Sequence, residues 1–235
     1  MYFSVVPSFY SVYQCIRCLP VDDAGRGAVI GPLVIAGVLV KEEDLPKLKE
    51  LGVKDSKLLS PHRREILAVE IRRIAVKFNV VKLSPREIDV VVNSGRKLHK
   101  LNYLEAQTMA RVIEVLKPDL VYVDASDVLE ERFKQHILEC MSYKVDIVSE
   151  HKADRNYVVV SAASIIAKVE RDKEIAELGK TLGDFGSGYP SDPRTMSFLK
   201  ECCEELEEYP DFVRKSWKPA KRVRDQKGSE QTRLI

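Results

Sequence analysis

The sequence predicts an α/β protein built on a mixed β-sheet that is flanked by helices, with a helical extension at the C-terminus. Two patterns predict this class: β-branched, apolar segments follow one another early in the chain, and strand-like segments then alternate with helix-like ones. The length of 235 residues and the 45% hydrophobic content suit one domain with a sizeable core. We expect an extension over 1–14, a main domain over 15–208, and a basic segment over 209–235 that packs on or trails from the domain.

The composition indicates the redox environment of the protein and the kind of partner that it fits. Its five cysteines are an odd number without the spacing of a disulfide framework, so we expect free thiols and a cytoplasmic, reducing environment. No stretch is long and apolar enough to span a membrane. The net charge of +2 hides basic residues concentrated near the C-terminus. They fit a polyanionic partner, although a solvated, partly disordered tail explains them equally well.

The first two strands are expected to pair at the centre of the sheet. The first covers about 15–22, where Pro20 is a local conflict because proline cannot donate a ladder hydrogen bond. The second lies in the run from Ala28 to Val40, which is too long for one flat strand and is bent or bulged at Gly31-Pro32. The segment between the two runs is rich in glycine, so we expect a turn there.

The rest of the chain alternates between helices and strands. Ser60-Pro61 is typical of a helix N-cap and first helical residue, and Ser84-Pro85-Arg86-Glu87 has the pattern of a capping box. Apolar positions at helical spacing predict the other helices, and short β-branched runs predict the strands. The expected helices are 60–75, a short one from 84, 99–116, 128–139, 158–178 and 193–208, and the expected strands are 76–83, 120–124 and 143–149.

The stretch from Asp22 to Gly27 is the first candidate site. Neighbouring acids on a strand point to opposite faces, so Asp22 and Asp23 reach one site only where the strand ends or twists. Gly25 and Gly27 supply that freedom, and N–H groups in such a turn hold an anion or a hydroxyl while Arg26 adds charge. Acids beside an anion-binding turn indicate metal-assisted phosphate chemistry, although two acids followed by glycine are also common in ordinary turns.

Two further acids are expected close to this turn. Asp124 ends an apolar strand, which is where α/β proteins place ligands, and its alternative role as a helix N-cap is filled equally well by Asp127. Asp154 precedes the helix over 158–178, where an acid is also a common cap or dipole partner. Four carboxylates without histidine or cysteine partners suit Mg²⁺ or Mn²⁺. The residues alone therefore predict a metal-dependent phosphotransfer or nuclease site, and they leave the substrate open.

Several motifs in a fixed order resemble the type 2 ribonuclease H family (ribonuclease HII), in its archaeal form. The resemblance runs from about residue 16 to 224. It rests on Asp22-Asp-Ala-Gly-Arg-Gly27, Lys54-Asp-Ser-Lys57, the strand ending at Asp124, His151-Lys-Ala-Asp154, Ser161-Ala-Ala-Ser-Ile-Ile-Ala-Lys168, Gly186-Ser-Gly-Tyr-Pro-Ser-Asp-Pro193 and Trp217-Lys218. It implies an RNase H-like catalytic domain that hydrolyses the RNA strand of RNA–DNA hybrids, including single ribonucleotides embedded in duplex DNA, and that leaves 3′-hydroxyl and 5′-phosphate ends.

The resemblance also implies roles for individual residues. The four carboxylates of the family's Mg²⁺ or Mn²⁺ site correspond to Asp22, Asp23, Asp124 and Asp154. The turn whose backbone reads the ribose 2′-hydroxyl corresponds to Gly25, Arg26 and Gly27. A loop that contacts phosphate corresponds to Lys54, Ser56 and Lys57. Tyr189 corresponds to the tyrosine that stacks on the sugar beyond the RNA–DNA junction.

Two departures from the family pattern bear on activity. The family carries glutamate where this chain has Asp23, and the side chain shorter by one methylene moves a carboxylate oxygen by more than about 1 Å, which octahedral Mg²⁺ tolerates poorly. The family also tends to carry glycine in place of Pro20. The leading expectation is an active enzyme, and the alternative is a catalytically weakened protein that binds RNA–DNA hybrids. Another RNase H-like nuclease, such as a DNA resolvase, is a third interpretation.

The expected partners are RNA–DNA hybrids and ribonucleotide-containing duplex DNA, bound by a monomer. The C-terminal residues Gln231-Thr-Arg-Leu-Ile235 resemble the start of a sliding-clamp-binding peptide. They lack its terminal aromatic pair, so a sliding clamp is a weaker expectation than the nucleic acid.

Overall fold

The fold of a computed structural model is a mixed five-stranded sheet with helices on both faces. The structure describes residues 16–53, 59–95, 100–151, 153 and 157–233. The strands are β1 (Arg17–Ala24), β2 (Leu33–Lys41), β3 (Lys77–Leu83), β4 (Leu120–Asp124) and β5 (Asp146–Glu150). Their order is β3-β2-β1-β4-β5, with antiparallel pairing on the β2 side of β1 and parallel pairing on the β4 side. The predicted mixed sheet flanked by helices, with a helical extension at the C-terminus, is confirmed.

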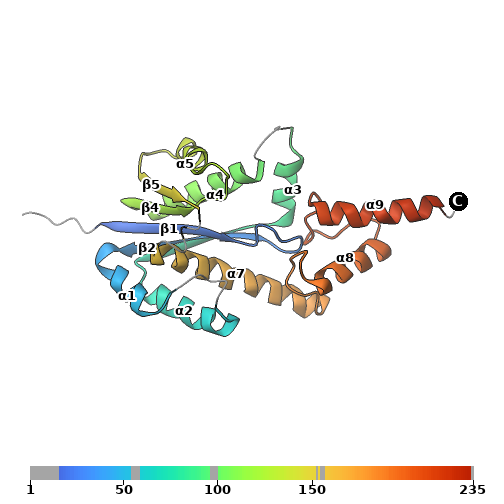
Figure 1. Cartoon of the computed structure of the whole chain (residues 1–235), viewed down its shortest axis with the longest axis horizontal. Coiled ribbons are helices and arrows are strands. Elements are labelled where there is room, and N and C mark those ends of the chain that lie inside the picture. The colour runs from blue at the N-terminus through green and yellow to red at the C-terminus, as the bar shows by residue number, and fades with distance from the viewer. Residues whose placement is uncertain (1–15, 54–58, 96–99, 152, 154–156, 234–235) are drawn as a thin grey trace, which may run out of the picture.

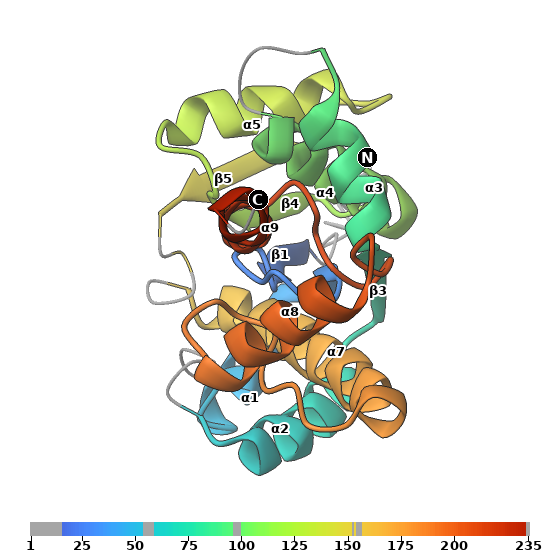
Figure 2. The same cartoon turned by 90° about the vertical axis from the view of Figure 1, so that its right-hand side faces the viewer.

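Two layers of helices enclose the sheet, which Figure 1 shows nearly edge-on. The helices α1 (Leu45–Glu50), α2 (Pro61–Ile74) and α7 (Val158–Leu182) lie below it in that view, and α4 (Lys100–Leu116) and α5 (Glu130–Glu139) lie above it, with α3 (Pro85–Asn93) beside α4. A short 3-10 helix, Glu42–Asp44, precedes α1. The helices α8 (Pro193–Glu205) and α9 (Lys218–Arg233) lie beyond the sheet, toward the viewer in Figure 2.

Strand alternation divides the core into two clusters, one on each face of the sheet. On β1, Cys18 and Ala24 pack in the cluster that contains α7, whereas Leu19 and Val21 pack in the cluster that contains α4. This is the period of two expected of a strand buried on both faces. The face on which a β1 side chain lies is therefore set by whether its number is even or odd, and this rule places the candidate acids.

Pro20 is accommodated inside a central strand. The register between β1 and β2 is interrupted at Leu19 and Pro20 and resumes at Val21, whereas on the other side Pro20 lies opposite Tyr122 of β4. Proline lacks an N–H and so cannot donate to a neighbouring strand, which accounts for the interruption. The expected conflict is therefore present, and its effect is limited to a local gap in the pairing between β1 and β2.

Two of the predicted helix N-termini, those with strong local sequence signals, are confirmed. The Ser60 side chain accepts a hydrogen bond from the Arg63 N–H at the start of α2, and Ser84 and Glu87 form the complete capping box of α3. The prediction for Asp127 was wrong in position, because the N-cap of α5 is Leu129. The Asp127 carboxylate instead accepts a hydrogen bond from the Leu129 N–H at 3.2 Å and pairs with Arg132.

Several other boundaries differ from the expected ones. The run over 28–40 forms a strand only from Leu33, because Gly31 has a φ of +87° and interrupts the extended backbone before it. The strand expected over 143–149 is Asp146–Glu150, and the helix expected over 193–208 ends at Glu205. These shifts of a few residues change no element type.

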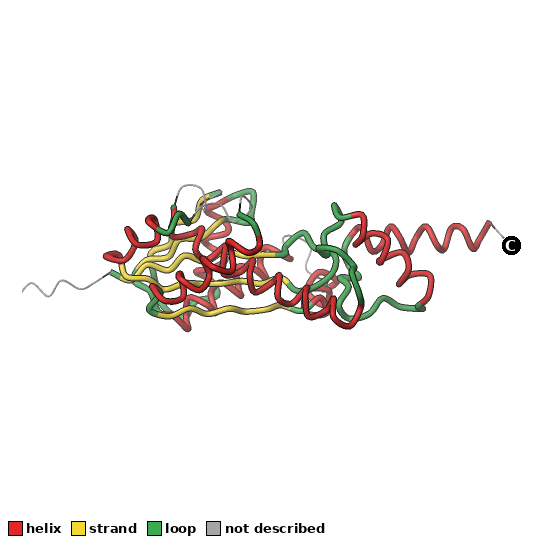
Figure 3. The backbone as a smooth tube through the Cα atoms, turned by 90° about the horizontal axis from the view of Figure 1, so that it is seen from below, coloured by secondary structure: helices red, strands yellow, loops and turns green. Residues whose placement is uncertain are grey.

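The C-terminal part packs against the end of the sheet as a third hydrophobic cluster. Residues of α8 and α9, including Leu199 and Val223, pack with Val29 and Ile30, which follow the glycine turn. Ile30 also forms an isolated antiparallel bridge with Val213. In the tube view of Figure 3 the red helices α8 and α9 extend past the ends of the yellow strands. No helix in the described ranges is long and apolar enough to cross a membrane.

Candidate active site

Two adjacent aspartates lie near the end of β1 on opposite faces of the sheet. Asp22 has an even number and so lies on the α7 side, where it is 5% exposed and hydrogen-bonds with Ser164 of α7. Asp23 lies on the α4 side, is half-buried, and accepts a hydrogen bond from the Ser126 hydroxyl at 3.3 Å. The Asp23 N–H donates to Asp22 Oδ1 at 2.7 Å. Both carboxylates line one cavity near the end of the strand, which lies at Ala24 and not at the expected residue 22.

The third acid comes from the neighbouring parallel strand. Val21 of β1 lies opposite Val123 of β4, so Asp124 follows at the same level as Asp22. Asp124 Oδ1 accepts a hydrogen bond from the Ala153 N–H at 3.1 Å, which ties the end of β4 to the segment before α7. Asp154, the fourth predicted acid, lies outside the described residues, as do Lys54, Ser56 and Lys57.

The acids raise one another's pKa. Burial, followed by the charges of Asp23 and Asp124, raises the pKa of Asp22 well above its usual value. Burial also raises the pKa of Asp23, while the nearby Arg26 guanidinium opposes part of that shift. Burial and mutual repulsion both make it unfavourable for these carboxylates to be ionised together without a counter-charge. The site therefore has a strong electrostatic demand for a cation.

The oxygen-only donor set fits a hard divalent cation such as Mg²⁺ or Mn²⁺. Asp22, Asp23 and Asp124 line the same cavity, and a bound cation would offset the repulsion that raises the pKa of Asp22 and of Asp23. Within the described ranges no group of three acidic, histidine or cysteine side chains is close enough to form a complete metal site. Within the described residues, the three aspartates therefore do not by themselves form a metal site.

The two glycines of the turn, Gly25 and Gly27, have different structural roles. Gly25 has a φ of +91°, and a Cβ there would lie 2.5 Å from Arg171 Nε and 2.7 Å from the Pro32 carbonyl oxygen. Gly27 is exposed, and a Cβ there would meet nothing within 4 Å. The fold therefore requires glycine at Gly25. At Gly27 the missing side chain leaves the backbone open to a molecule approaching from the cavity.

The Arg26 side chain is held by α4. Its Nε lies 2.9 Å from Glu105 Oε1, and its Nη2 donates to Asn102 Oδ1 at 2.6 Å. Glu105 is fully buried, and burial together with the charge of Asp23 raises its pKa well above the usual value. These contacts fix the guanidinium on the α4 side of the turn, although the Arg26 side chain remains partly exposed and lines the cavity.

Two buried arginines from distant segments support the turn. Arg214 is fully buried, and its guanidinium donates to the carbonyl oxygens of Arg26 at 2.9 Å and Gly31 at 3.1 Å. Burial lowers the pKa of Arg214 to about 10, and its guanidinium lies 5.0 Å from the ring centre of Trp217. Arg171 of α7 approaches the turn from the other side, at Gly25.

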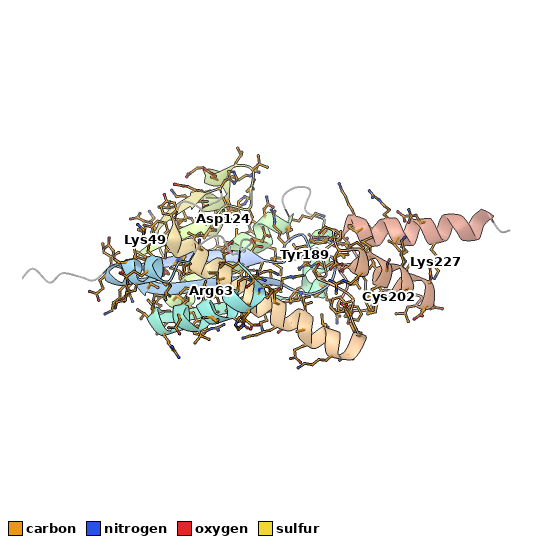
Figure 4. The ribbon with its side chains drawn as sticks, turned by 60° about the horizontal axis from the view of Figure 1, so that its bottom comes forward. Lys49, Arg63, Asp124, Tyr189, Cys202 and Lys227 are labelled. Carbon is orange, nitrogen blue, oxygen red and sulfur yellow. The ribbon has the colours of Figure 1, made fainter. Side chains whose placement is uncertain are left out.

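Tyr189 borders the same cavity from the loop before α8. The cavity has a volume of about 280 Å³ and is lined by Asp22, Asp23, Ala24, Gly25, Arg26, Gly27, Asp124, Ser164, Lys168 and Tyr189. Figure 4 labels Asp124 and Tyr189 in the central part of the molecule, with Cys202 and Lys227 farther along on the C-terminal helices. The structure thus brings together seven of the predicted residues, and the other four are those outside its described ranges.

Of the basic and polar residues behind the acids, the sequence indicates Ser164 and Lys168 only as part of the Ser161–Lys168 motif, and Arg171 was missed. Ser164, Lys168 and Arg171 come from α7, and their spacing of four and three residues places them on one face of that helix. This spacing was a usable signal, because a charged residue on a helix face that is otherwise made of small, buried residues indicates a specific contact. Arg214 and Glu105 gave no such signal, since only the tertiary structure brings them to the turn.

The comparisons with known proteins agree with this geometry. The family model described as Ribonuclease HII matches residues 19–220. A Ribonuclease HII from Thermococcus onnurineus is 46% identical over 210 residues, which is 89% of this chain and 91% of that protein. The crystal structure of the ribonuclease H2 from Pyrococcus horikoshii matches with a TM-score of 0.82 and 41% identity over 90% of this chain and 98% of that one. The structure of a PCNA:RNase HII complex from Archaeoglobus fulgidus matches with a TM-score of 0.79 and 45% identity over 88% and 96% of the two chains.

Proposed function

Because this chain belongs to the ribonuclease HII family, we propose that it is an endonuclease that hydrolyses the RNA strand of RNA–DNA hybrids and incises on the 5′ side of ribonucleotides embedded in duplex DNA. One observation carries the proposal. Asp22, Asp23 and Asp124 converge on a cavity whose rim includes the exposed backbone of Gly27. Acids for phosphate chemistry thus lie beside a backbone that a sugar can approach.

The four aspartates Asp22, Asp23, Asp124 and Asp154 would hold the catalytic Mg²⁺ or Mn²⁺ ions. Such ions, when bound, supply an activated water and stabilise the leaving oxygen of a phosphodiester. The residues themselves hold oxygen ligands in a partly dry cavity: Ser164 fixes the Asp22 carboxylate, and the Ala153 N–H fixes that of Asp124. The products would be 3′-hydroxyl and 5′-phosphate ends.

The substrate contacts are assigned to the elements around the acids. The turn Gly25–Gly27 would read the ribose 2′-hydroxyl, the group that separates RNA from DNA, with its backbone. The open backbone at Gly27 supports this, because Gly27 is exposed and has no side chain to block an approaching sugar. The Tyr189 ring would stack on the adjacent deoxyribose, and the loop residues Lys54, Ser56 and Lys57 would contact phosphates.

Asp23 decides between this function and its alternative, a weakened protein that binds hybrids without cutting them. Its Oδ1 is held by Ser126 on the α4 side of β1, and glutamate there would extend the carboxylate by about 1.5 Å, one C–C bond. We expect the natural protein to incise and Asp23→Glu to incise at least as fast. A natural protein that binds without cutting, with cutting restored in Asp23→Glu, would establish the alternative.

A sliding clamp is proposed as a partner. The relative from A. fulgidus was solved in complex with PCNA, and the chain here ends in the segment Gln231–Ile235. A version of the protein lacking 231–235, compared with the full chain by calorimetric titration with a sliding clamp, tests this assignment. Equal affinity of the two proteins would place any clamp contact elsewhere.

The first experiment is an incision assay on an end-labelled DNA duplex that contains one ribonucleotide. Asp124→Asn keeps the size of the side chain and removes its charge, so it should abolish incision with Mg²⁺ and with Mn²⁺. The matched control is Asp119→Asn, which changes an aspartate at the other end of β4 that pairs with Arg17. The control should cut at the natural rate. Incision of an all-DNA duplex at the same rate would instead indicate another RNase H-like nuclease.

A further inference from the structure

Arg171 is a buried cation that the proposed chemistry does not use. It lies on α7, is 1% exposed, and desolvation by this burial lowers its pKa. Its Nε is buried and makes no hydrogen bond with the described residues. Asp172, its nearest ion-pair partner, lies 4.0 Å from Nη1 and is engaged by Lys168 at 2.5 Å. Placing a cation in such surroundings is costly, so the contacts of Arg171 deserve an explanation beyond a salt bridge.

The guanidinium of Arg171 holds the loop that carries Tyr189. Its Nη2 donates to the Ser187 carbonyl oxygen at 2.9 Å, and its Cζ lies 4.4 Å from the centre of the Tyr189 ring. The second cation near this ring, Lys168, is farther away at 6.0 Å. A guanidinium this close to the ring, desolvated and hydrogen-bonded to the adjacent loop, helps to fix the position of the ring.

The same side chain also contacts the glycine turn. A Cβ at Gly25 would lie 2.5 Å from Arg171 Nε and 2.6 Å from its Cδ, and a Cβ at Gly188 would lie 3.1 Å from Nη2. Both glycines have positive φ angles, +91° and +78°. Two loops, separated by some 160 residues of sequence, therefore close on one arginine. Because the interior is close-packed, moving the guanidinium moves both loops relative to each other.

We propose that Arg171 is a positioning residue that sets the spacing between the turn Gly25–Gly27 and the Tyr189 ring, and thereby determines the preference for a ribonucleotide followed by a deoxyribonucleotide. The inference rests on the proposed function, in which the turn contacts the ribose and Tyr189 contacts the next sugar. A uniform RNA–DNA hybrid offers the turn a ribose at whichever nucleotide it binds, but it contains no step from a ribonucleotide to a deoxyribonucleotide. The spacing should therefore matter most where both contacts must be made at once.

The test compares two substrates cut by the same preparation: a duplex with one ribonucleotide and a uniform RNA–DNA hybrid. The ratio of their kcat/KM values is insensitive to any fraction of unfolded protein, so a destabilised variant remains informative. Arg171→Lys keeps the charge but loses the planar fork that donates to Ser187 while it lies over the ring. We expect the ratio to fall by about tenfold, the loss expected when one stacking contact is displaced. Arg171→Met should lower it at least as much.

Arg72 provides the matched control. It is an arginine of α2 that pairs with Glu170, lies 5.5 Å from the centre of the Phe78 ring and does not line the cavity. Arg72→Lys should leave the substrate ratio unchanged. The double variant Arg171→Lys/Tyr189→Ala should have the same ratio as Tyr189→Ala alone, because Arg171 acts on the junction through that ring.

Each outcome bears on one claim. A natural protein that cuts neither substrate overturns the proposed function before Arg171 is considered. A natural protein that cuts both, with Arg171→Lys slowing both by the same factor, shows that Arg171 only supports the fold and overturns the inference alone. A further fall of the ratio in the double variant beyond that of Tyr189→Ala also overturns it, since Arg171 would then act independently of the ring.

Discussion

Replacing Arg214 by methionine should destabilise the protein, and the structure sets the size of the effect. Methionine approximates the length of the side chain, but the carbonyl oxygens of Arg26 and Gly31 lose the donors that lie 2.9 Å and 3.1 Å away. Each buried acceptor left unpaired costs about 1–3 kcal/mol. Removing a desolvated charge offsets part of that cost. The expected net loss of unfolding free energy is about 2–4 kcal/mol.

The assay is equilibrium urea denaturation followed by far-ultraviolet circular dichroism. The matched control is Arg63→Met, which removes an exposed arginine that donates to the Leu51 carbonyl oxygen at 3.1 Å. Water replaces that donor, so the control should lose less than about 1 kcal/mol. A loss below 1 kcal/mol for Arg214→Met as well would refute the reasoning, because it would mean that the two carbonyl oxygens find water or another donor once the guanidinium is gone.

Three further predictions follow from contacts near the site and on α2. In the loop of Tyr189, the Ser187 N–H and Arg194 hold the pKa of Asp192 at about 2, below the usual 3.8. Above pH 3.8 the natural protein should therefore be more stable than Asp192→Asn. Urea denaturation should show that this advantage is lost as the pH falls from 3.8 to about 2. Gly25→Ala should destabilise the protein by more than about 2 kcal/mol through backbone strain and overlap with Arg171, whereas Gly27→Ala should leave the melting temperature unchanged and slow incision. Ser60→Ala, which removes the α2 N-cap, should cost about 1 kcal/mol of stability without changing the rate of incision.

The elements that the sequence predicts well are those with local causes. The strand Leu120–Asp124 matches its predicted bounds because a proline and an acid bracket a short apolar run. The capping box at Ser84 and Glu87 is likewise complete within four residues of sequence. Asp22, Asp23 and Asp124 could be assigned to one site because strand ends have a predictable place in an α/β fold. The side of the sheet on which each lies follows from alternation alone.

The features that sequence reasoning missed have causes that are distant in the chain. Arg214 is a charged residue of a kind normally found at the surface, and no local pattern shows that it is buried, whereas the burial of Arg171 has a signal only in its helical spacing from Ser164 and Lys168. The basic C-terminal segment supported a disordered tail as well as a helix. It forms α9 because a few contacts, such as those of Ala220 and Val223 with the third cluster, anchor an otherwise polar helix.

The Arg214 contact also bears on the order in which the protein is assembled during synthesis. Arg26 and Arg214 are 188 residues apart, so the turn leaves the ribosome long before the residue that braces it. At about 5–20 residues per second the turn waits roughly 10–40 s for its partner. The acids of β1 are present on the growing chain throughout this interval, beside a turn whose carbonyl oxygens still face water. The turn therefore gains the contacts that brace it only when about the last tenth of the 235 residues is being added.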